Sequence, residues 1–376
     1  MKYGYIYADY NATAPISENI KQAISEVLSL QTLNPSSLHQ GGLAARKILQ
    51  NTRDSIYNFM GVCKNKKIVF TSSATEANNL AMNGLKDHIH VVSAIEHPSI
   101  LYSANKPYII PVNRDGVIEL IALEKTLEKL RGNKVLVSVM LANNETGVIQ
   151  PIHQISEIAH SFGAICHTDA VQGIGKITVN MEDLGVDLLT LSAHKIGGIA
   201  GSGVLIFDKQ QKIEPIIYGG GQENGLRGGT ENIVAIAALS AALHDVPKLL
   251  AKMKEVETLR NRLEYELLSL AHDIVIFGKN SHRLPNTSYI YMPGVKSDVQ
   301  LMNFDLNNIA VSNGSACSAG RVESSHVLLA MGATKEQAEC SLRVSIGWNT
   351  TYRDIEKIKD CWYAIYGKHI KLSTKK

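Results

Sequence analysis

The sequence predicts an α/β protein with a mostly parallel sheet that helices cover on both faces, followed by a smaller α+β unit. Between about residue 66 and residue 207, short apolar runs rich in β-branched residues alternate with polar loops and helical stretches. Such alternation is typical of parallel sheets that are buried on both faces. Beyond about residue 270 the pattern changes, which indicates a second unit of different architecture.

The individual elements are predicted from local patterns. The predicted strands of the main sheet are Lys67–Thr71, His90–Ser93, Val135–Leu141, Ala164–Thr168, Leu188–Ser192 and Gly203–Phe207. The long amphipathic stretch Val246–Leu270 predicts a helix that leaves this unit. Asp273–Phe277 and Thr287–Tyr291 then predict strands of the smaller unit, and Tyr352–Tyr366 predicts the last helix.

Bulk composition excludes several function classes. With 376 residues, 45% of them hydrophobic, the chain can bury a large core in two or three units. A net charge of only +3 argues against direct nucleic-acid binding. No apolar run reaches the roughly 18 residues that span a bilayer, and no leader pattern opens the chain, so we expect no membrane partner. Five scattered cysteines without a CxxC pair predict a cytoplasmic protein with neither disulfides nor zinc.

Polar and ionisable residues directly follow five of the predicted strands. They are Ser72–Glu76, Glu96–Pro98, Asn143–Glu145, Asp169 with Gln172, and His194 with Lys195. Ligands of open parallel sheets bind outside the carboxyl ends of the strands. Because titratable residues that gather at such an edge mark functional sites, the sequence predicts a site there.

Each of these groups taken alone also has a plain structural interpretation. Ser72–Thr75 either caps a helix or binds a phosphate at its start. Asp169 either caps a turn or keeps a pyridine nitrogen protonated, and His97 either fills a helix start or stacks on an aromatic ring. Lys195 is either a solvated charge or a desolvated nucleophile for a Schiff base. Together they favour a phosphorylated, electron-accepting aldehyde cofactor, and pyridoxal phosphate fits.

Glycine-rich runs add one further candidate. Gly225–Thr230 (GLRGGT) is either a flexible loop or a backbone held close to a phosphate, with the Thr230 hydroxyl as a donor. The GIGK run at Gly173–Lys176 is too short for a Walker loop, and no glycine run has the dinucleotide-binding spacing.

Cys317 differs from the other cysteines in its surroundings. The stretch Asn313–Gly320 is small and polar throughout, which predicts an exposed loop and an accessible thiol. Cys63, Cys166, Cys340 and Cys361 suit buried positions instead. Arg343, in a strand-like run, is either a surface ion-pair partner or a bidentate clamp for a carboxylate.

These residues occur within motifs that resemble those of the cysteine desulfurases of the NifS/IscS group, in the class V aminotransferase family. The matching segments, over nearly the whole chain, are Tyr7–Pro15, Asn34–Gly42, Ser72–Ala81, Glu96–Ile100, Asn143–Ile152, His167–Gln172, Leu191–Gly198, Gly219–Asn232 and Ser312–Cys317. The resemblance implies the aspartate-aminotransferase-like fold of type I pyridoxal-phosphate enzymes. It implies a large domain, residues 15–250, with a mostly parallel seven-stranded sheet. Residues 1–14 and 251–376 would form the small domain, with the catalytic cysteine loop at about 312–325.

The resemblance also implies a role for each site residue. Lys195 would hold pyridoxal phosphate covalently, His97 would stack on its ring and move protons, and Cys317 would attack the substrate sulfur. Asp169 would pair with the ring nitrogen and Gln172 with the phenolic oxygen. The phosphate ligands would be Thr75, Ser192 and His194, with Thr230 reaching across from the second subunit of a homodimer. The substrate carboxylate ligands would be Asn34, Asn144 and Arg343. No resident metal is implied, although Cys317 would touch a cluster transiently.

The implied reaction converts L-cysteine to L-alanine and leaves a persulfide on Cys317. The sulfur would pass to an acceptor protein, such as an iron–sulfur scaffold, for cluster assembly or tRNA thiolation. Alternatives are a selenocysteine lyase, a cysteine-sulfinate desulfinase, a transaminase-like relative, or a non-enzymatic assembly platform. The chain departs from the common motifs in GGIAG after Lys195, in RGGT with no serine, in Ser73 where glycine is frequent, and in Asn313 where serine is frequent.

Overall fold

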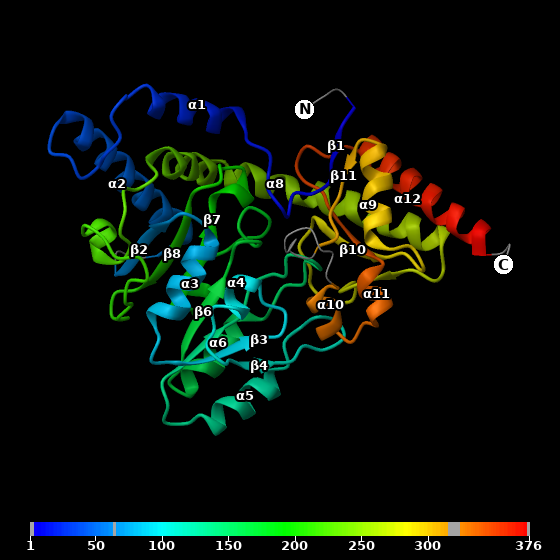
Figure 1. Cartoon of the computed structure of the whole chain (residues 1–376), viewed down its shortest axis with the longest axis horizontal. Coiled ribbons are helices and arrows are strands. Elements are labelled where there is room, and N and C mark those ends of the chain that lie inside the picture. Colours follow the sequence, from blue (N-terminus) through cyan, green and yellow to red (C-terminus); the bar gives the residue numbers. More distant parts are fainter. Residues whose placement is uncertain (1–3, 63–64, 315–323, 374–376) are drawn as a thin grey trace.

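The large sheet has seven strands in the order β2-β8-β7-β6-β5-β3-β4. The computed structural model describes residues 4–62, 65–314 and 324–373 (Figure 1). The strands are β2 (Lys66–Thr71), β3 (Ile89–Ser93), β4 (Tyr108–Ile110), β5 (Val135–Ser138), β6 (Ile165–Asp169), β7 (Leu188–Ser192) and β8 (Gly203–Asp208). Only β8 runs antiparallel to its neighbours β2 and β7. The predicted fold class is confirmed, and the carboxyl ends of the other strands share one edge.

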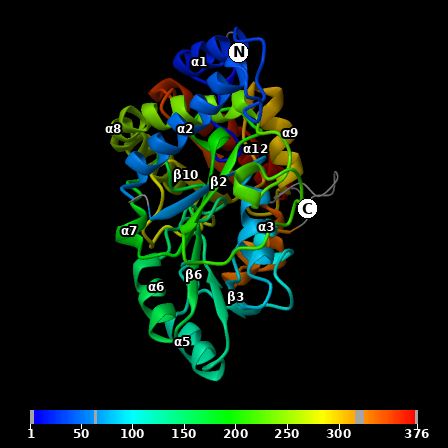
Figure 2. The ribbon, with the colours of Figure 1, turned by 90° about the vertical axis from the view of Figure 1, so that its left-hand side faces the viewer.

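Helices cover both faces of this sheet. Alternate residues of a strand point to opposite faces, and they belong to different hydrophobic clusters. Leu205 and Phe207 of β8 pack with α3 (Ala74–Gly84) and α4 (Pro98–Leu101). Val204 and Ile206 face the opposite cluster. That cluster takes residues from α2 (Gln40–Met60), α5 (Leu120–Lys129), α6 (Ile152–Ser161), α7 (Met181–Leu184) and the first half of α8 (Ile233–Leu270). Figure 2 shows α3 on one side of the sheet and α5 and α6 on the other.

Helix α8 begins at Ile233, so the predicted start at Val246 is wrong. The first half escapes sequence-based prediction because it is apolar almost all round and lacks the amphipathic period of a surface helix. It packs against α2 and α1 (Glu18–Leu28). By length and composition alone α8 could cross a membrane, which corrects the expectation that no such stretch exists. The buried residues of this half belong to the core of the large sheet.

Residues on either side of Pro247, which lies inside α8, belong to different hydrophobic clusters. Leu243 and Val246 belong to the cluster of the large sheet. Met253 and Val256 belong to a second cluster with α9 (Ser297–Leu306) and α12 (Tyr352–Ser373). The helix therefore continues from one core into the other, as Figure 1 shows.

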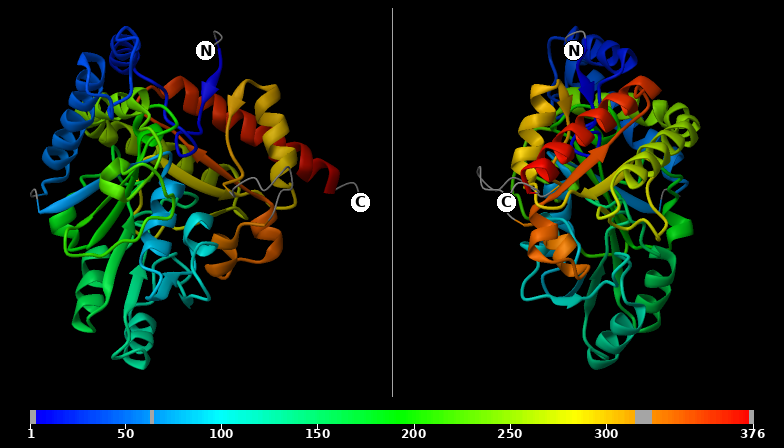
Figure 3. Two further views of the ribbon diagram at one scale, coloured as in Figure 1. Left: turned by 60° about the vertical axis from the view of Figure 1, so that its left-hand side comes forward. Right: turned by 90° about the vertical axis from the view of Figure 1, so that its right-hand side faces the viewer.

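The second core contains a three-stranded antiparallel sheet in the order β12-β10-β9. Its strands are β9 (Val275–Ile276), β10 (Thr287–Tyr291) and β12 (Ser341–Ser345). The short helices α10 (His326–Ala330) and α11 (Lys335–Glu339) precede β12. The start of the chain joins this part, because β1 (Ile6–Tyr7) pairs in parallel with β11 (Ile309–Ala310). Figure 3 shows the β1 and β11 segments beside α9 and α12.

Several boundaries differ from the sequence prediction for identifiable reasons. β5 ends at Ser138 rather than Leu141: the N–H groups of Val139 and Leu141 still donate to β6 carbonyls, whereas the Met140 N–H donates to a side chain, Glu96 Oε1 (2.8 Å). β9 is shorter than Asp273–Phe277, and α12 extends beyond Tyr366 to Ser373. The short strand β4, which lies between two prolines, was not predicted.

Candidate active site

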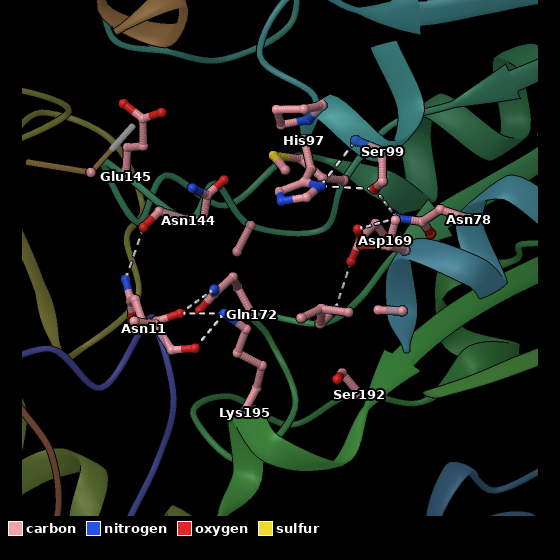
Figure 4. A pocket seen from close by; sticks show the side chains of 18 of the residues that line it. Asn11, Asn78, His97, Ser99, Asn144, Glu145, Asp169, Gln172, Ser192 and Lys195 are labelled. Atoms are coloured by element: carbon pink, nitrogen blue, oxygen red, sulfur yellow. Dashed lines mark hydrogen bonds between the residues drawn. The ribbon is translucent and has the colours of Figure 1, made fainter. Parts of the chain in front are cut away.

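A cavity of about 480 Å³ opens at the carboxyl edge of the large sheet. Residues that follow β2, β3, β5, β6 and β7 line it. Residues from segments 9–12 and 312–343 complete the lining. Figure 4 shows their side chains around the cavity. The predicted site residues that line it are Thr75, His97, Asn144, Asp169, Gln172, Ser192, His194, Lys195 and Arg343.

Three predicted site residues are not among those that line this cavity. Cys317, like Cys63, lies outside the described residues. Asn34 is exposed in the loop before α2, where its Oδ1 accepts a hydrogen bond from the Ser36 N–H (3.0 Å). Thr230 is also exposed. Within a single chain, neither Asn34 nor Thr230 contributes to the cavity that contains Lys195.

Lys195 reaches the cavity from a single 3-10 turn, Ala193–Ile196, which ends at Gly197 with φ of 90°. Its Nζ donates to the backbone carbonyls of Asn11 (2.6 Å) and Ala12 (2.8 Å). Burial, followed by the positive charge of Arg343, lowers the pKa of the Lys195 amine to about 8. Because desolvation disfavours the ammonium, the nucleophilic neutral amine is available near neutral pH.

A chain of hydrogen bonds connects Asp169, at the end of β6, with His97 (Figure 4). The two N–H groups of the Asn78 amide donate to Asp169 Oδ2 (2.8 Å) and to Ser99 Oγ (2.9 Å). The Ser99 hydroxyl is then left to donate to His97 Nδ1 (2.8 Å). The Ser99 backbone N–H also donates to that nitrogen (3.1 Å). Since an N–H can only donate, Nδ1 is an acceptor, and a neutral His97 carries its proton on Nε2.

His97 is held in the neutral form. Burial lowers the pKa of its imidazole; the charge of Asp169 opposes this shift, while Lys195 adds to it. His194, which also lines the cavity, behaves alike: burial, followed by the charge of Lys195, lowers its pKa to about 4. Both rings therefore act near neutral pH as hydrogen-bonding groups rather than as cations.

The start of α3 forms a cradle for an anion. Ser73 caps the helix by accepting the Glu76 N–H (3.2 Å), which leaves the N–H groups of Ala74 and Thr75 without helical acceptors. Ser73, Ala74 and Thr75 line the cavity with Ser192 and His194. Gly203 allows β8 to lie close to the Ser73 backbone at the start of α3, since a Cβ at residue 203 would lie 2.2 Å from the backbone carbon of Ser73. Helix starts of this kind bind phosphate groups.

The missing serine in the RGGT motif has a local reason. A Cβ at Gly228 would lie 2.4 Å from the backbone nitrogen of Gly219. The two arms of the glycine-rich loop are thus packed backbone to backbone, and a side chain at 228 requires the loop to shift.

Arg343 is buried on β12 and connects the two sheets. Its guanidinium donates to Asp9 Oδ1 (2.7 Å) and to the backbone carbonyl of Asn144 (2.9 Å). Its Nε has no hydrogen-bond partner among the described residues. A guanidinium with a free donor beside a cavity can bind the carboxylate of a ligand.

The chain on both sides of residues 315–323 is fixed at the rim of this cavity. Ser312 and Arg343 exchange two backbone hydrogen bonds, and the Tyr289 hydroxyl donates to the Asn313 carbonyl (2.7 Å). On the other side, the Ser325 hydroxyl donates to the buried carboxyl of Glu145. Gly314 and His326 both line the cavity. The segment that contains Cys317 therefore leaves and rejoins the described structure at the site.

Sequence reasoning assigned no role to several residues that line the site: Asp9, Asn11, Asn78 and Ser99. Asn11 is the most connected of them. Its side-chain N–H groups donate to the Asn144 carbonyl (3.1 Å) and to Thr287 Oγ1 (2.9 Å). All four lie within the sequence motifs of the NifS/IscS group, but their side chains gave no signal beyond helix or turn formation.

Pyridoxal phosphate fits this donor set. An amine of lowered pKa, a carboxylate and an anion cradle line a single cavity large enough for a small cofactor. Among the described residues, no cluster of His, Cys, Asp and Glu could hold a metal ion.

Comparison with known proteins identifies the family. The aminotransferase class-V family model matches residues 6–358. The cysteine desulfurase IscS of Dictyoglomus turgidum is 37% identical over 372 residues, which cover 94% of this chain and 93% of that protein. The chain belongs to the class V aminotransferase family, in its NifS/IscS group. Pyridoxal phosphate is the cofactor of this family.

Solved structures agree with this assignment to the NifS/IscS group. A NifS-like protein from Rickettsia africae has a TM-score of 0.89 at 37% identity, covering 96% of this chain and 99% of that chain. A structure described as SspA in complex with cysteine has a TM-score of 0.76 at 28% identity, covering 92% of this chain and 100% of that chain. The sequence-based resemblance to the NifS/IscS group is confirmed.

Proposed function

We propose that the protein is a pyridoxal-phosphate-dependent cysteine desulfurase that converts L-cysteine to L-alanine and leaves a persulfide on Cys317. One observation carries the proposal: the Lys195 amine and the Asp169 carboxylate line the same cavity, at the edge of the sheet where the chain before and after residues 315–323 is anchored.

The cofactor would be held by residues that already surround the cavity. Lys195 would hold its aldehyde carbon covalently, Asp169 its ring nitrogen, and the start of α3 with Ser192 and His194 its phosphate. When bound, the ring supplies an electron sink for the charge left by removal of the substrate α-proton. The Asn78 amide donates to one oxygen of Asp169 (2.8 Å), which fixes the orientation of the carboxyl group that would pair with the ring nitrogen.

The substrate would be oriented by Arg343 and Asn144. Arg343 lines the cavity and would bind a carboxylate oxygen, while Asp9 fixes one terminal nitrogen of its guanidinium. Lys195 lines the cavity and would take the α-proton, since its pKa of about 8 suits a base near neutral pH. His97, with its proton on Nε2, lines the same cavity and would assist proton transfer.

The sulfur step exchanges one bond for another. The Cys317 thiolate attacks the substrate sulfur, an S–S bond forms, and the C–S bond breaks with its electron pair moving to the carbon. That carbon is then protonated, so that L-cysteine and the Cys317 thiol become L-alanine and a Cys317 persulfide. A thiolate is required, because the neutral thiol is a poor nucleophile.

We further propose a homodimer in which Asn34 and Thr230 complete the site of the second copy. Pro35 and Ser36, beside Asn34, and Glu231, beside Thr230, line one shallow cavity of about 410 Å³, so both segments face the same region of the surface. We also propose that the protein is cytoplasmic. Its sulfur would pass to an acceptor such as an iron–sulfur scaffold, or serve tRNA thiolation. Cys166, Cys340 and Cys361 are free and buried, as a reducing compartment allows.

Initial rates with three substrates test this function. Purified protein loaded with pyridoxal phosphate is given L-cysteine, L-selenocysteine or L-cysteine sulfinate, with a thiol reductant, and alanine is measured. We expect alanine from L-cysteine with equivalent sulfide. Alanine from selenocysteine or sulfinate alone would support the lyase or desulfinase alternatives instead, and no alanine from any substrate would reject a desulfurase.

Arg343→Lys should raise the KM for L-cysteine by about tenfold or more, because the lysine keeps the charge but loses the planar donor fork. We expect kcat to fall less than kcat/KM. The check is steady-state alanine release over a range of L-cysteine concentrations. Arg283→Lys is the matched control, since Arg283 is an equally buried arginine paired with Glu264. An unchanged KM in Arg343→Lys would exclude Arg343 as the carboxylate ligand.

Covalent attachment of pyridoxal phosphate to the apoprotein should accelerate as the pH rises to about 8 and then level off. The sign is set by the lowered pKa of Lys195, about 8, because only the neutral amine attacks an aldehyde. Stopped-flow absorbance across the pH range measures this rate. A rate that continues to rise toward the ordinary lysine pKa of about 10.4 would show that Lys195 is not desolvated.

A further inference from the structure

Lys176 is a second buried lysine close to Lys195. It ends the GIGK run, four residues after Gln172, and is not among the residues that line the cavity. Only 6% of its surface is exposed. Lys176 and Lys195 both line a small void behind the cavity wall. The proposed mechanism gives Lys176 no role.

The contacts of Lys176 are two amide oxygens. Its Nζ donates to Asn11 Oδ1 (2.8 Å) and to Gln172 Oε1. No carboxylate among the described residues pairs with it. Lys66, equally buried on β2, shows the usual arrangement instead, with Asp208 Oδ1 2.9 Å from its Nζ.

Each amide is held at two points, by a backbone carbonyl, which can only accept, and by the Lys176 amine. The Asn11 Nδ2 group faces the Asn144 carbonyl, so its Oδ1 must face Lys176. The Gln172 Nε2 group faces the Asn11 carbonyl (3.0 Å), so its Oε1 must face Lys176 as well. Lys176 is thus the hydrogen-bond donor to both amide oxygens.

A neutral amine satisfies this geometry best. An unpaired buried ammonium is expensive, whereas a neutral amine has two N–H donors for these two acceptors. Burial, followed by the positive charges of Lys195 and Arg343, holds the pKa of Lys176 well below its ordinary value. The two amide oxygens are therefore bound by a neutral amine, so that no second ammonium group lies beside Lys195.

Gln172 keeps one donor for a ligand. Its Nε2 carries two N–H groups, and the described residues provide one acceptor, the Asn11 carbonyl. Gln172 lines the cavity. With Oε1 held by Lys176 behind the wall, the group that remains to face a ligand is an N–H.

We propose that Lys176 is a positioning residue of the active site, which locks the Gln172 amide so that it presents an N–H, and never its oxygen, to an anionic ring oxygen of the bound cofactor. The same amine ties Gln172 to Asn11, whose backbone carbonyl accepts the Lys195 amine. This inference rests on the proposed function, because the cofactor supplies that oxygen.

A double-mutant cycle tests the inference on the cofactor-loaded protein. Lys176→Met removes both donors and leaves the Gln172 amide held by the Asn11 carbonyl alone, so that its free N–H is no longer fixed toward the cofactor. Loss of the donor favours the protonated form of the cofactor, so the pH midpoint of its visible absorbance should rise by about one unit. Gln172→Leu should raise the midpoint similarly. Adding Lys176→Met to Gln172→Leu should then change it little, because Lys176 acts through Gln172.

Lys66→Met is the matched control. It removes an equally buried lysine with its ion pair, so we expect a lower thermal midpoint of unfolding but an unchanged absorbance midpoint. A purely structural Lys176 would behave in the same way, and that result would overturn the inference. So would a full shift that persists in the Gln172→Leu background. Should Lys176→Met not fold, Lys176→Gln, which keeps one donor, enters the same cycle with a smaller expected shift.

The wild-type protein separates this inference from the proposed function. If it takes up no pyridoxal phosphate, the proposed function itself fails. If it titrates normally while Lys176→Met matches it, only the role of Lys176 is rejected.

Discussion

Lys195→Ala should eliminate covalent cofactor attachment and lower the rate of alanine formation on the order of 10³-fold or more. The variant removes the amine that would hold the cofactor, together with the base proposed to take the α-proton, and proton transfer alone contributes about 10² to 10⁴. The cavity itself should survive, because Asn11 and Ala12 offer Lys195 only backbone carbonyls. The measurements are the visible spectrum after borohydride reduction and alanine release from L-cysteine.

Lys66→Ala serves as the control for Lys195→Ala. This variant also removes a buried lysine, on β2. Because Lys66 forms an ion pair with Asp208 away from the cavity, its loss tests stability alone. We expect Lys66→Ala to retain both the cofactor and the activity. An unchanged spectrum in Lys195→Ala, with label on another lysine after reduction, would refute the assignment of Lys195.

Cys317→Ser should keep the yellow colour of the loaded enzyme and lose alanine and sulfide formation by about 10³-fold or more. The proposed cofactor ligands are all other residues, so we expect cofactor binding to be preserved. A serine hydroxyl is a far weaker nucleophile toward sulfur than a thiolate, and no ordinary pKa shift ionises it near neutral pH. Absorbance and alanine assays on the same preparation separate the two effects.

Cys361→Ser is the matched control for Cys317→Ser. Cys361 is a free, buried cysteine on α12, and burial raises the pKa of its thiol to about 11. It should therefore keep full turnover. Normal turnover by Cys317→Ser would mean that another group accepts the sulfur.

The alternation of strands and polar loops predicted the large sheet and the contents of its edge. That succeeded because buried parallel strands are continuous apolar runs, and the polar residues at the carboxyl end of each run are easy to identify. The first half of α8 was not predictable in this way, because its apolar residues show no period. The pairing of β1 with β11 joins residues about 300 positions apart by two residues each, which no local pattern encodes.

Charged and reactive side chains of the site were predictable, whereas the groups that orient them were not. Asp169, His97 and Lys195 are rare combinations at strand ends. Asn78 and Ser99 have the pattern of ordinary helix residues until folding places them between Asp169 and His97. In the sequence, Lys176 belongs only to a run too short for a phosphate loop, and its burial without a carboxylate is a tertiary fact.

A single turnover without reductant tests the central claim most directly. Loaded enzyme is mixed with L-cysteine, alanine is quantified, and the peptide that contains Cys317 is analysed by mass spectrometry. With L-cysteine limited to one equivalent per active site, because excess cysteine is itself a thiol reductant, we predict one alanine per active site and the added mass of one sulfur atom on Cys317, removed by a thiol reductant. Alanine formed with Cys317 unmodified, or sulfur found on another cysteine, would contradict the account.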